Sequence, residues 1–152
     1  MQTRRQHLQQ TAIVAGMLAS TGLFPQFAHA AFNKAAFDAK SIADALKAYG
    51  AAAPTESKDV TITAPDIAEN GAVVPLGAST SLTNVKQLLI LVEKNPSALV
   101  AMFNITDSID AAVSTRAKMG QSSDVYAVAL TTDGKALFAK KEVKVTLGGC
   151  GG

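Results

Sequence analysis

The sequence predicts an all-β protein, an immunoglobulin-like β-sandwich of about seven strands behind a short N-terminal helix. Three observations predict this fold class. Short apolar segments recur from residue 59 to residue 147, as the strands of a sandwich do. Turn residues separate these segments, and the sequence contains no internal repeats. One segment of helical periodicity precedes them.

Residues 37–49 predict an amphipathic helix. Apolar side chains at helical spacing fall near one face: Phe37, Ile42, Ala45, Leu46 and Tyr49. Charged side chains lie away from that face: Lys40, Asp44 and Lys47. Gly50 follows at a position where glycine commonly ends a helix. Residues 51–54 are typical of a connector.

Seven segments after residue 59 have the composition and length of strands. They are residues 60–63, 73–75, 85–92, 98–105, 111–119, 125–131 and 136–147. Pro75 predicts that the second segment is an edge strand or lies close to a bulge, because proline cannot donate a ladder hydrogen bond. Residues 85–92 form a continuous apolar run, which favours a strand but also suits a helix.

Two dipeptides indicate turns, Asn70-Gly71 and Asp133-Gly134. Both are common in tight turns because their residues tolerate a positive φ. Asp133-Gly134 lies between two strand segments and therefore predicts a hairpin.

The first thirty residues have the three-part pattern of a secretory signal peptide. Arg4 and Arg5 form the basic start, residues 11–24 the apolar core, and Ala28-His29-Ala30 the cleavage site. We therefore expect cleavage between Ala30 and Ala31. A membrane anchor is the alternative, but an uncharged core of 14 residues is shorter than the ~20 that span a bilayer.

The adjacent pair Arg4-Arg5 resembles a twin-arginine signal, which exports folded proteins across a bacterial inner membrane. His7 and Gln9 depart from the usual motif. The general secretory route is the alternative, because two arginines also suit its basic region. Both routes predict a periplasmic protein.

Cleavage at this site leaves a protein of balanced charge. The full chain has 14 basic and 12 acidic residues. Arg4 and Arg5 leave with the signal and no acidic residue does, so 12 of each remain. Balanced charge gives no electrostatic basis for binding nucleic acid or an anionic membrane.

Both histidines, His7 and His29, also lie in the signal. The mature chain then has no histidine and one cysteine, Cys150. This composition excludes Ser-His-Asp and Cys-His catalysis, and it excludes a Cys/His zinc site within one chain. It also excludes an internal disulfide, so we expect a fold held by its core and no resident cofactor.

Cys150 is the residue on which the functional interpretation depends. It lies in the run Gly148-Gly149-Cys150-Gly151-Gly152, directly after a strand segment. Glycine has no β-carbon and visits both signs of φ, so this run predicts a flexible carrier arm. An exposed thiol is partly thiolate at neutral pH, and it can attack a disulfide or accept a sulfur-containing group.

An incidental cysteine in a disordered tail is the alternative. An exposed thiol in an oxidising compartment forms disulfide dimers, which argues against an accident. Lipid attachment is disfavoured as well. Prenylation requires a cysteine four residues from the end, and a lipoprotein cysteine would follow the signal, where the chain has Ala31.

The remaining charged candidates predict structural roles. Asp66, Glu69 and Asp107 stand beside turn residues, where solvated carboxylates are common. Arg116 lies in a strand segment and is expected to pair with an acidic residue.

Two further groups of side chains carry no predicted chemistry. Met102 and Met119 are interpreted as core or interface packing. The lysines upstream of the arm are assigned no role: Lys140, Lys141 and Lys144.

The sequence therefore predicts four parts. A signal peptide of twin-arginine type occupies residues 1–30, and the helix with its connector occupies residues 31–58. The sandwich occupies residues 59–147, and the carrier arm residues 148–152.

The terminal run Gly148-Gly149-Cys150-Gly151-Gly152 resembles the signature of the SoxY family, the sulfur-carrying subunits of the periplasmic Sox thiosulfate-oxidation system. Four further segments resemble that family in order and spacing, and with the run they cover nearly all of residues 60–152. They are residues 67–71 with Val74-Pro75, residues 93–96, residues 113–116 and residues 143–146.

The resemblance implies an immunoglobulin-like domain paired with SoxZ, a second small β-sandwich protein, as a heterodimer or heterotetramer. It implies that sulfur intermediates are attached covalently to Cys150. A haem-containing SoxAX enzyme would couple thiosulfate to the thiol, and a SoxB hydrolase would release sulfate. A SoxCD dehydrogenase would oxidise the remaining sulfane sulfur. The carrier itself would catalyse none of these steps.

Two other function classes stay open. An exported scaffold or adhesion protein could use Cys150 for a permanent intermolecular disulfide. A stand-alone thiol enzyme is disfavoured, because the mature chain has no histidine to act as its base.

Overall fold

The computed structural model describes residues 33–51 and 53–146. The chain divides into two units, Met1–Phe32 and Asn33–Gly152, and the described residues belong to the second. The predictions for the signal peptide, including Arg4, Arg5 and the Ala30-Ala31 cleavage site, lie outside the described residues.

Two short helices and nine strands make up the described part of the chain. The helices are α2 (Lys34–Asp38) and α3 (Ile42–Ala48). The strands are β1 (Thr55–Glu56), β2 (Val60–Thr63), β3 (Ile67–Ala68), β4 (Val74–Thr80), β5 (Val85–Val92), β6 (Leu99–Asn104), β7 (Ala112–Ala117), β8 (Ser123–Thr131) and β9 (Ala136–Val145). The predicted all-β, immunoglobulin-like sandwich is confirmed.

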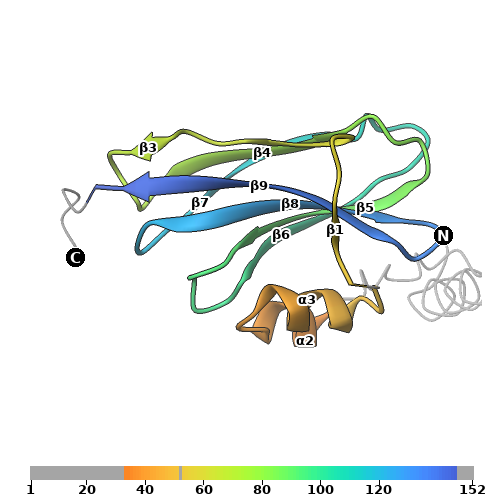
Figure 1. Ribbon diagram of the computed structural model, residues 1–152, viewed down its shortest axis with the longest axis horizontal. Coiled ribbons are helices and arrows are strands. Elements are labelled where there is room, and N and C mark those ends of the chain that lie inside the picture. Colours follow the sequence, from red (N-terminus) through yellow and green to blue (C-terminus); the bar gives the residue numbers. More distant parts are fainter. Residues whose placement is uncertain (1–32, 52, 147–152) are drawn as a thin grey trace, which may run out of the picture. The chain divides into compact units, whose positions relative to one another are not determined.

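The strands form two sheets that pack face to face (Figure 1). The larger sheet has the order β1-β9-β8-β5-β6, and β3 also pairs with β9. The smaller sheet has the order β2-β4-β7. Alternate residues of the facing strands fill the space between the sheets, since side chains alternate across a strand. Leu76, Leu88, Ile90, Val125 and Val143 are among the fully buried members of this core.

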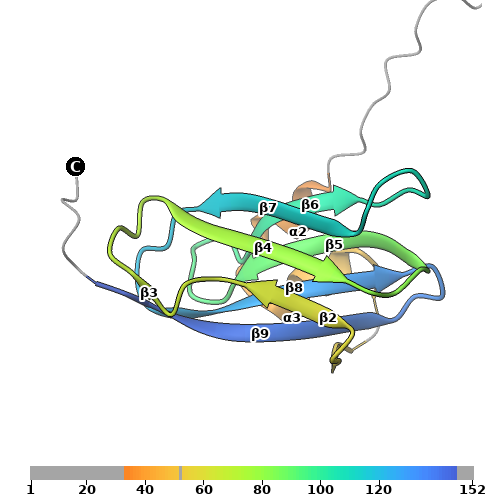
Figure 2. The ribbon, with the colours of Figure 1, turned by 90° about the horizontal axis from the view of Figure 1, so that it is seen from above.

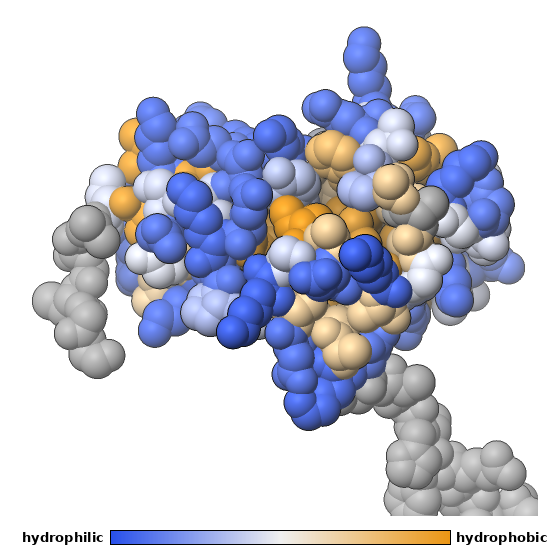
Figure 3. Space-filling model, turned by 60° about the horizontal axis from the view of Figure 1, so that its bottom comes forward, coloured by the Kyte–Doolittle hydropathy of each residue, from blue (hydrophilic) through white to orange (hydrophobic). Residues whose placement is uncertain are grey.

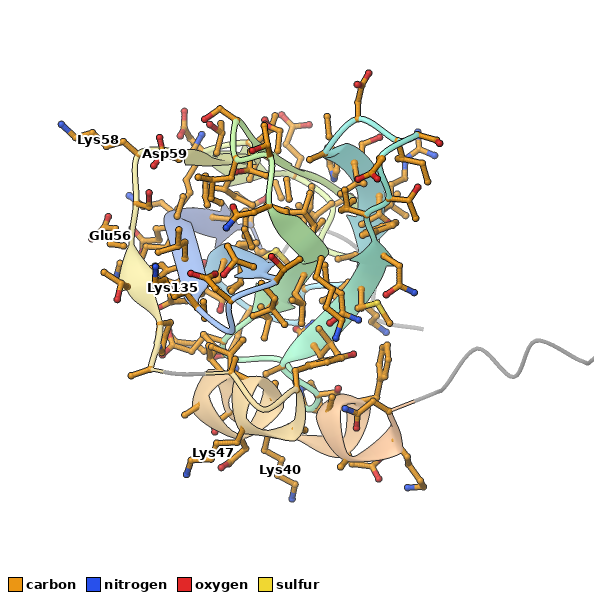
Figure 4. All side chains as sticks on the ribbon, turned by 90° about the vertical axis from the view of Figure 1, so that its right-hand side faces the viewer. Lys40, Lys47, Glu56, Lys58, Asp59 and Lys135 are labelled. Carbon is orange, nitrogen blue, oxygen red and sulfur yellow. The ribbon has the colours of Figure 1, made fainter. Side chains whose placement is uncertain are left out.

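The helices cover the outer face of the larger sheet and add a third layer (Figure 1). Ala45 and Leu46 of α3 belong to a second apolar cluster with Leu89, Leu91 and Val128 of that sheet. On the face that carries the helices, apolar surface gathers in a central patch within hydrophilic surface (Figure 3). Lys40 and Lys47 point away from the sheets, as predicted (Figure 4).

Burial on both faces explains the apolar run of β5. Leu88 and Ile90 face the core between the sheets, whereas Leu89 and Leu91 face the helices. A strand that is covered on both sides has no polar face, so its sequence does not alternate. The prediction of a strand over residues 85–92 is confirmed, and the helical alternative is wrong.

The single helix predicted over residues 37–49 is wrong in its extent. The chain leaves the helical conformation at Ala39 (φ −64°, ψ 130°), and the Ser41 side chain caps a new helix by accepting from Asp44 N at 3.1 Å. Ala98 N donates to the Ala39 carbonyl at 3.0 Å, which ties the break to the start of β6. Gly50 ends α3 with a φ of 66° and donates to the Lys47 carbonyl at 2.8 Å.

Pro75 lies in a central strand, so the prediction of an edge strand is wrong for β4 as a whole. β4 pairs with β7 along Val74–Ser79, and with β2 only from Gly77 onward. At Pro75 the side toward β2 is therefore unpaired. The missing N–H does not break a ladder there, which is why a proline is accepted in this strand.

Two strands of two residues each were not predicted. Both β1 and β3 pair in parallel with β9, through Thr55↔Leu137 and Ile67↔Lys144. They pair with the edge of β9 that is not paired with β8, on the opposite side of the sheet from β6. Of the two predicted turns, Asp133-Gly134 forms the β8–β9 hairpin with Gly134 at a φ of 82°. Asn70-Gly71 lies in the loop between β3 and β4.

Adding a methyl group at Gly71 is expected to destabilise the sandwich. A β-carbon there would lie 2.4 Å from the Met119 carbonyl oxygen and 2.8 Å from Val145 Cγ1. Overpacking of this kind costs about 1–3 kcal/mol. Gly71→Ala should lower the free energy of unfolding in urea by that amount. Gly120→Ala is the matched control, because a β-carbon at Gly120 meets nothing within 4 Å; equal losses in the two variants would contradict the packing argument.

Candidate functional site

The candidate site is the arm that carries Cys150 together with the surface from which it extends. Cys150, the four arm residues Gly148, Gly149, Gly151 and Gly152, and Leu147 lie outside the described residues. The structure describes the arm's base, which is the end of β9 up to Thr146. β9 runs toward the end of the sandwich at the left of Figures 1 and 2.

Backbone hydrogen bonds hold the end of β9 on both edges. On one edge, Lys144 N donates to the Asp66 carbonyl at 3.0 Å and Thr146 N donates to the Ala68 carbonyl at 3.1 Å. On the other, Val145 N donates to Ser122 Oγ at 2.9 Å. β8 pairs with β9 up to Ser123↔Val143, so Ser122 extends the support beyond the last ladder pair.

Close packing fixes the same strand end from the core side. Val143 is fully buried, and Met119 is 1% exposed. Met119 N donates to the Gly71 carbonyl at 2.7 Å. A β-carbon at Gly71 would collide with Val145, so the glycine lets the β3–β4 loop approach β9. The end of β9 is thus held on both edges and from the core side.

Chain length sets an upper limit on the distance between Cys150 and this base. Cys150 follows Thr146 by four residues. An extended chain spans about 3.3–3.6 Å per residue, which places the cysteine up to roughly 13 Å from Thr146. A reactive centre in another protein must therefore come within about that distance of the end of β9.

The lysines upstream of the arm have different surroundings. Lys141 Nζ donates to the Ala64 carbonyl at 2.7 Å and pairs with Asp66 at 2.9 Å. Lys140 pairs with Asp124 at 3.1 Å, and the hydrogen bond that Lys140 Nζ donates to this carboxylate is the main cause that raises the pKa of Lys140. Lys144 is exposed beside Ile67 at the arm's base.

The carboxylates considered in the sequence do not converge. Asp66 and Glu69 flank β3, and Asp107 lies in the loop between β6 and β7. All three are exposed, as expected for turns. Within residues 33–51 and 53–146, no group of three or more His, Cys, Asp or Glu residues could hold a metal ion.

The other predicted side chains lie away from the arm or in the core. Arg116 is in β7 as expected, but among the described residues it forms no ion pair, so the expected acidic partner is not found there. Met119 is core, and Met102 is half-buried in β6. No helix in the described part of the chain has the length and apolarity needed to cross a membrane.

Comparison with known proteins identifies the family. The family model "Sulfur oxidation protein SoxY" matches residues 45–150. The chain belongs to the SoxY family. It is also similar to the solved sulfur carrier protein SoxY from Chlorobium limicola f. thiosulfatophilum, with 35% identity and a TM-score of 0.64. That match covers 70% of this chain and 97% of the other.

A more distant likeness concerns the fold alone. A superoxide reductase (neelaredoxin) from Ignicoccus hospitalis shares 16% identity at a TM-score of 0.51. The match covers 57% of the SoxY-family chain and 79% of the reductase. A search of the curated proteins gave no match.

Sequence reasoning missed the residues that hold the arm's base. Ser122 is 23 residues away from Val145, and no local pattern marks a serine as the acceptor for so distant an N–H. The two residues of β3 are too few to show a strand period. Gly71 was recognised as a turn residue, but its contact with β9 was not.

Removing the Ser122 hydroxyl is expected to loosen the end of β9. Ser122→Ala leaves the Val145 N–H without its acceptor, and a lost hydrogen bond of this kind costs about 1 kcal/mol. Amide hydrogen exchange at Val145 should become roughly five- to tenfold faster, since exchange follows the local opening free energy. Ser114→Ala, on the exposed side of β7, should leave that rate unchanged. An unaltered rate in Ser122→Ala would show that Ser122 does not hold the strand end.

Proposed function

We propose that this protein is a covalent sulfur carrier in thiosulfate oxidation, with Cys150 as the attachment point. The observation that carries the proposal is membership of the SoxY family over residues 45–150, a range that ends on the cysteine itself. The sulfur carrier from Chlorobium limicola supports the same role. A rigid base below a glycine-rich run suits a group that must visit several partners.

The proposed cycle begins with thiolate attack on a sulfur donor. Coupling of the Cys150 thiolate to thiosulfate gives a cysteine S-thiosulfonate and two electrons, which a haem-containing SoxAX enzyme would accept. Water then cleaves the terminal S–S bond in a SoxB hydrolase, releasing sulfate with its protons and leaving a persulfide on the cysteine. A SoxCD dehydrogenase, where present, would oxidise that sulfane sulfur. The carrier supplies the nucleophile and no acid–base catalyst.

We propose a periplasmic location after twin-arginine export, with the general secretory route as the alternative. The support is the Arg4-Arg5 pair ahead of an apolar run and the Ala30-Ala31 junction. The carrier needs no resident cofactor in this scheme, because the sulfur intermediates are bonded directly to Cys150.

We further propose that a SoxZ-like subunit binds along the open edge of β6. Among the described strands, β6 pairs only with β5, whereas the far edge of the same sheet is covered by β1 and β3. The strand reads Leu-Val-Ala-Met-Phe-Asn and carries no charge. Charged or proline residues usually protect such an edge, and their absence favours pairing with another strand.

The register of β6 indicates which of its backbone N–H and C=O groups are available to bond to a partner strand. Ile105 N donates to the Lys86 carbonyl at 3.0 Å. Hydrogen-bonded and open positions alternate along an antiparallel pair. Residues 101 and 103 therefore bond to β5, and Met102 and Asn104 present their N–H and C=O groups outward for a partner strand.

Replacing Cys150 tests the carrier role. Protein isolated without reductant, or incubated with thiosulfate and extract that contains the partner enzymes, should show added sulfur, sulfite or thiosulfate on the peptide that contains Cys150. Intact-mass measurement should find no such adducts in Cys150→Ser. Free thiol alone in the wild type after that incubation would contradict the proposal. A stable dimer that does not exchange, with full activity in Cys150→Ser, would instead favour the scaffold.

A charge on the β6 edge is expected to weaken binding of the second subunit. Met102→Lys adds a charge to the edge strand itself, which opposes pairing with a partner strand, and the dissociation constant should rise at least about tenfold, equivalent to ~1.4 kcal/mol. Ser114→Lys on the exposed side of β7 is the matched control. Thermal unfolding of both variants checks the fold. Equal dissociation constants for the two lysine variants would show that β6 is not part of the interface.

A further inference from the structure

The described part of the chain exposes three large apolar side chains. Ile67 is 58% exposed, Val73 52% and Ile109 52%. None of the three belongs to either apolar cluster. Scattered apolar residues are ordinary on a protein surface, so the position of these three decides whether they have a role.

Ile67 and Val73 both stand at the base of the Cys150 arm. Ile67 is in β3, directly opposite Lys144 of β9. Val73 ends the β3–β4 loop, whose Gly71 packs on Val145. The Thr146 hydroxyl lies 3.4 Å from the Ala68 and Glu69 carbonyls of the same loop region. Two segments distant in sequence from the arm thus bring exposed apolar groups beside its origin.

Ile109 lies at the opposite end of the sandwich. It is in the β6–β7 loop, which leads into β7 where Ala112 pairs with Ser79. The end of β7 nearer the arm is Ala117, which pairs with Val74. Figure 2 shows the β6–β7 loop and the end of β9 at opposite ends of the domain. The chain therefore offers an apolar residue of equal exposure that is remote from the arm.

The length of the arm dictates what must touch its base. Cys150 lies at most roughly 13 Å from Thr146, and a catalytic centre buried in an enzyme is reached only through an opening. An enzyme that takes the thiol into such a centre must bring the rim of that opening against the surface around Thr146. Residues that flank the end of β9 are then buried in each productive complex.

We propose that Ile67 and Val73 form a docking collar for the hydrolase that releases sulfate from thiosulfate-loaded Cys150. The collar would contact an apolar rim around the entrance to the active site of that hydrolase. This inference rests on the proposed carrier function and names the surface by which that function selects its partners. Two apolar side chains bind weakly enough for release, which a carrier that passes between enzymes requires.

The charges beside the collar favour apolar contact over electrostatic attraction. Asp66, Glu69 and Lys144 are exposed close to Ile67. The two carboxylates are opposite in charge to Lys144, and Asp66 also pairs with Lys141. Such a mixed set gives little steering of a charged partner. Docking through the collar should accordingly depend weakly on ionic strength.

The test compares the double variant Ile67→Ser/Val73→Ser with Ile109→Ser in the full chain. The measured reaction is the removal of sulfate from the thiosulfate-loaded carrier by its SoxB-type hydrolase, with carrier concentration varied. Loss of two buried apolar contacts should raise KM about tenfold or more with kcat nearly unchanged. Ile109→Ser should match the wild type.

Two further measurements separate docking from other causes. Reaction of the unloaded Cys150 thiol with a small aromatic disulfide should be equal in all three proteins, because a small reagent needs no docking surface. Thermal unfolding should also agree, since all three side chains are exposed. Wild-type KM in the double variant, or an equal rise in Ile109→Ser, would overturn the collar. If the wild type forms no adduct at all, the proposed carrier function fails instead.

Discussion

The fixed end of β9 is the constraint on which the rest of the structure depends. A reactive group on a short run of glycines is useful only if its origin is rigid, because the origin decides which volume the group can reach. The Asp66 and Ala68 carbonyls hold one edge of the strand end, and Ser122 Oγ holds the other. Gly71 has no β-carbon and so lets the β3–β4 loop pack closely against the end of β9.

The long strands and the hairpin could be predicted because their signals are local. β2 and β5 have the predicted bounds, since turn residues delimit them in the sequence. Tertiary contacts account for the differences. Ser41 and the Ala39–Ala98 hydrogen bond divide the predicted helix. β2 ends at Thr63, opposite Gly77 of β4, and so leaves the side of Pro75 toward β2 unpaired. Strands as short as β1 and β3 show no hydrophobic period in the sequence.

The sequence indicates the chemistry of the candidate site but not the structure that surrounds it. One cysteine among glycines stands out in composition, and family membership agrees with the role that this motif indicates. The sequence does not single out Ser122, Ile67 or Val73, because the position of each depends on contacts with residues distant in the sequence. Exposure at Ile67 follows from the parallel pairing of β3 with β9, which the sequence alone does not show.

The pairing of β9 with β1 and β3 also determines when the domain can be completed. Thr55 pairs with Leu137, and Ile67 pairs with Lys144, so these ladders join segments that lie far apart in the sequence. Contacts at such large sequence separation form slowly. Until β9 is in place, β8 lacks its neighbour and two segments from the first half of the domain lack their partner. The strand that bears the arm's base is therefore also the strand that completes the larger sheet.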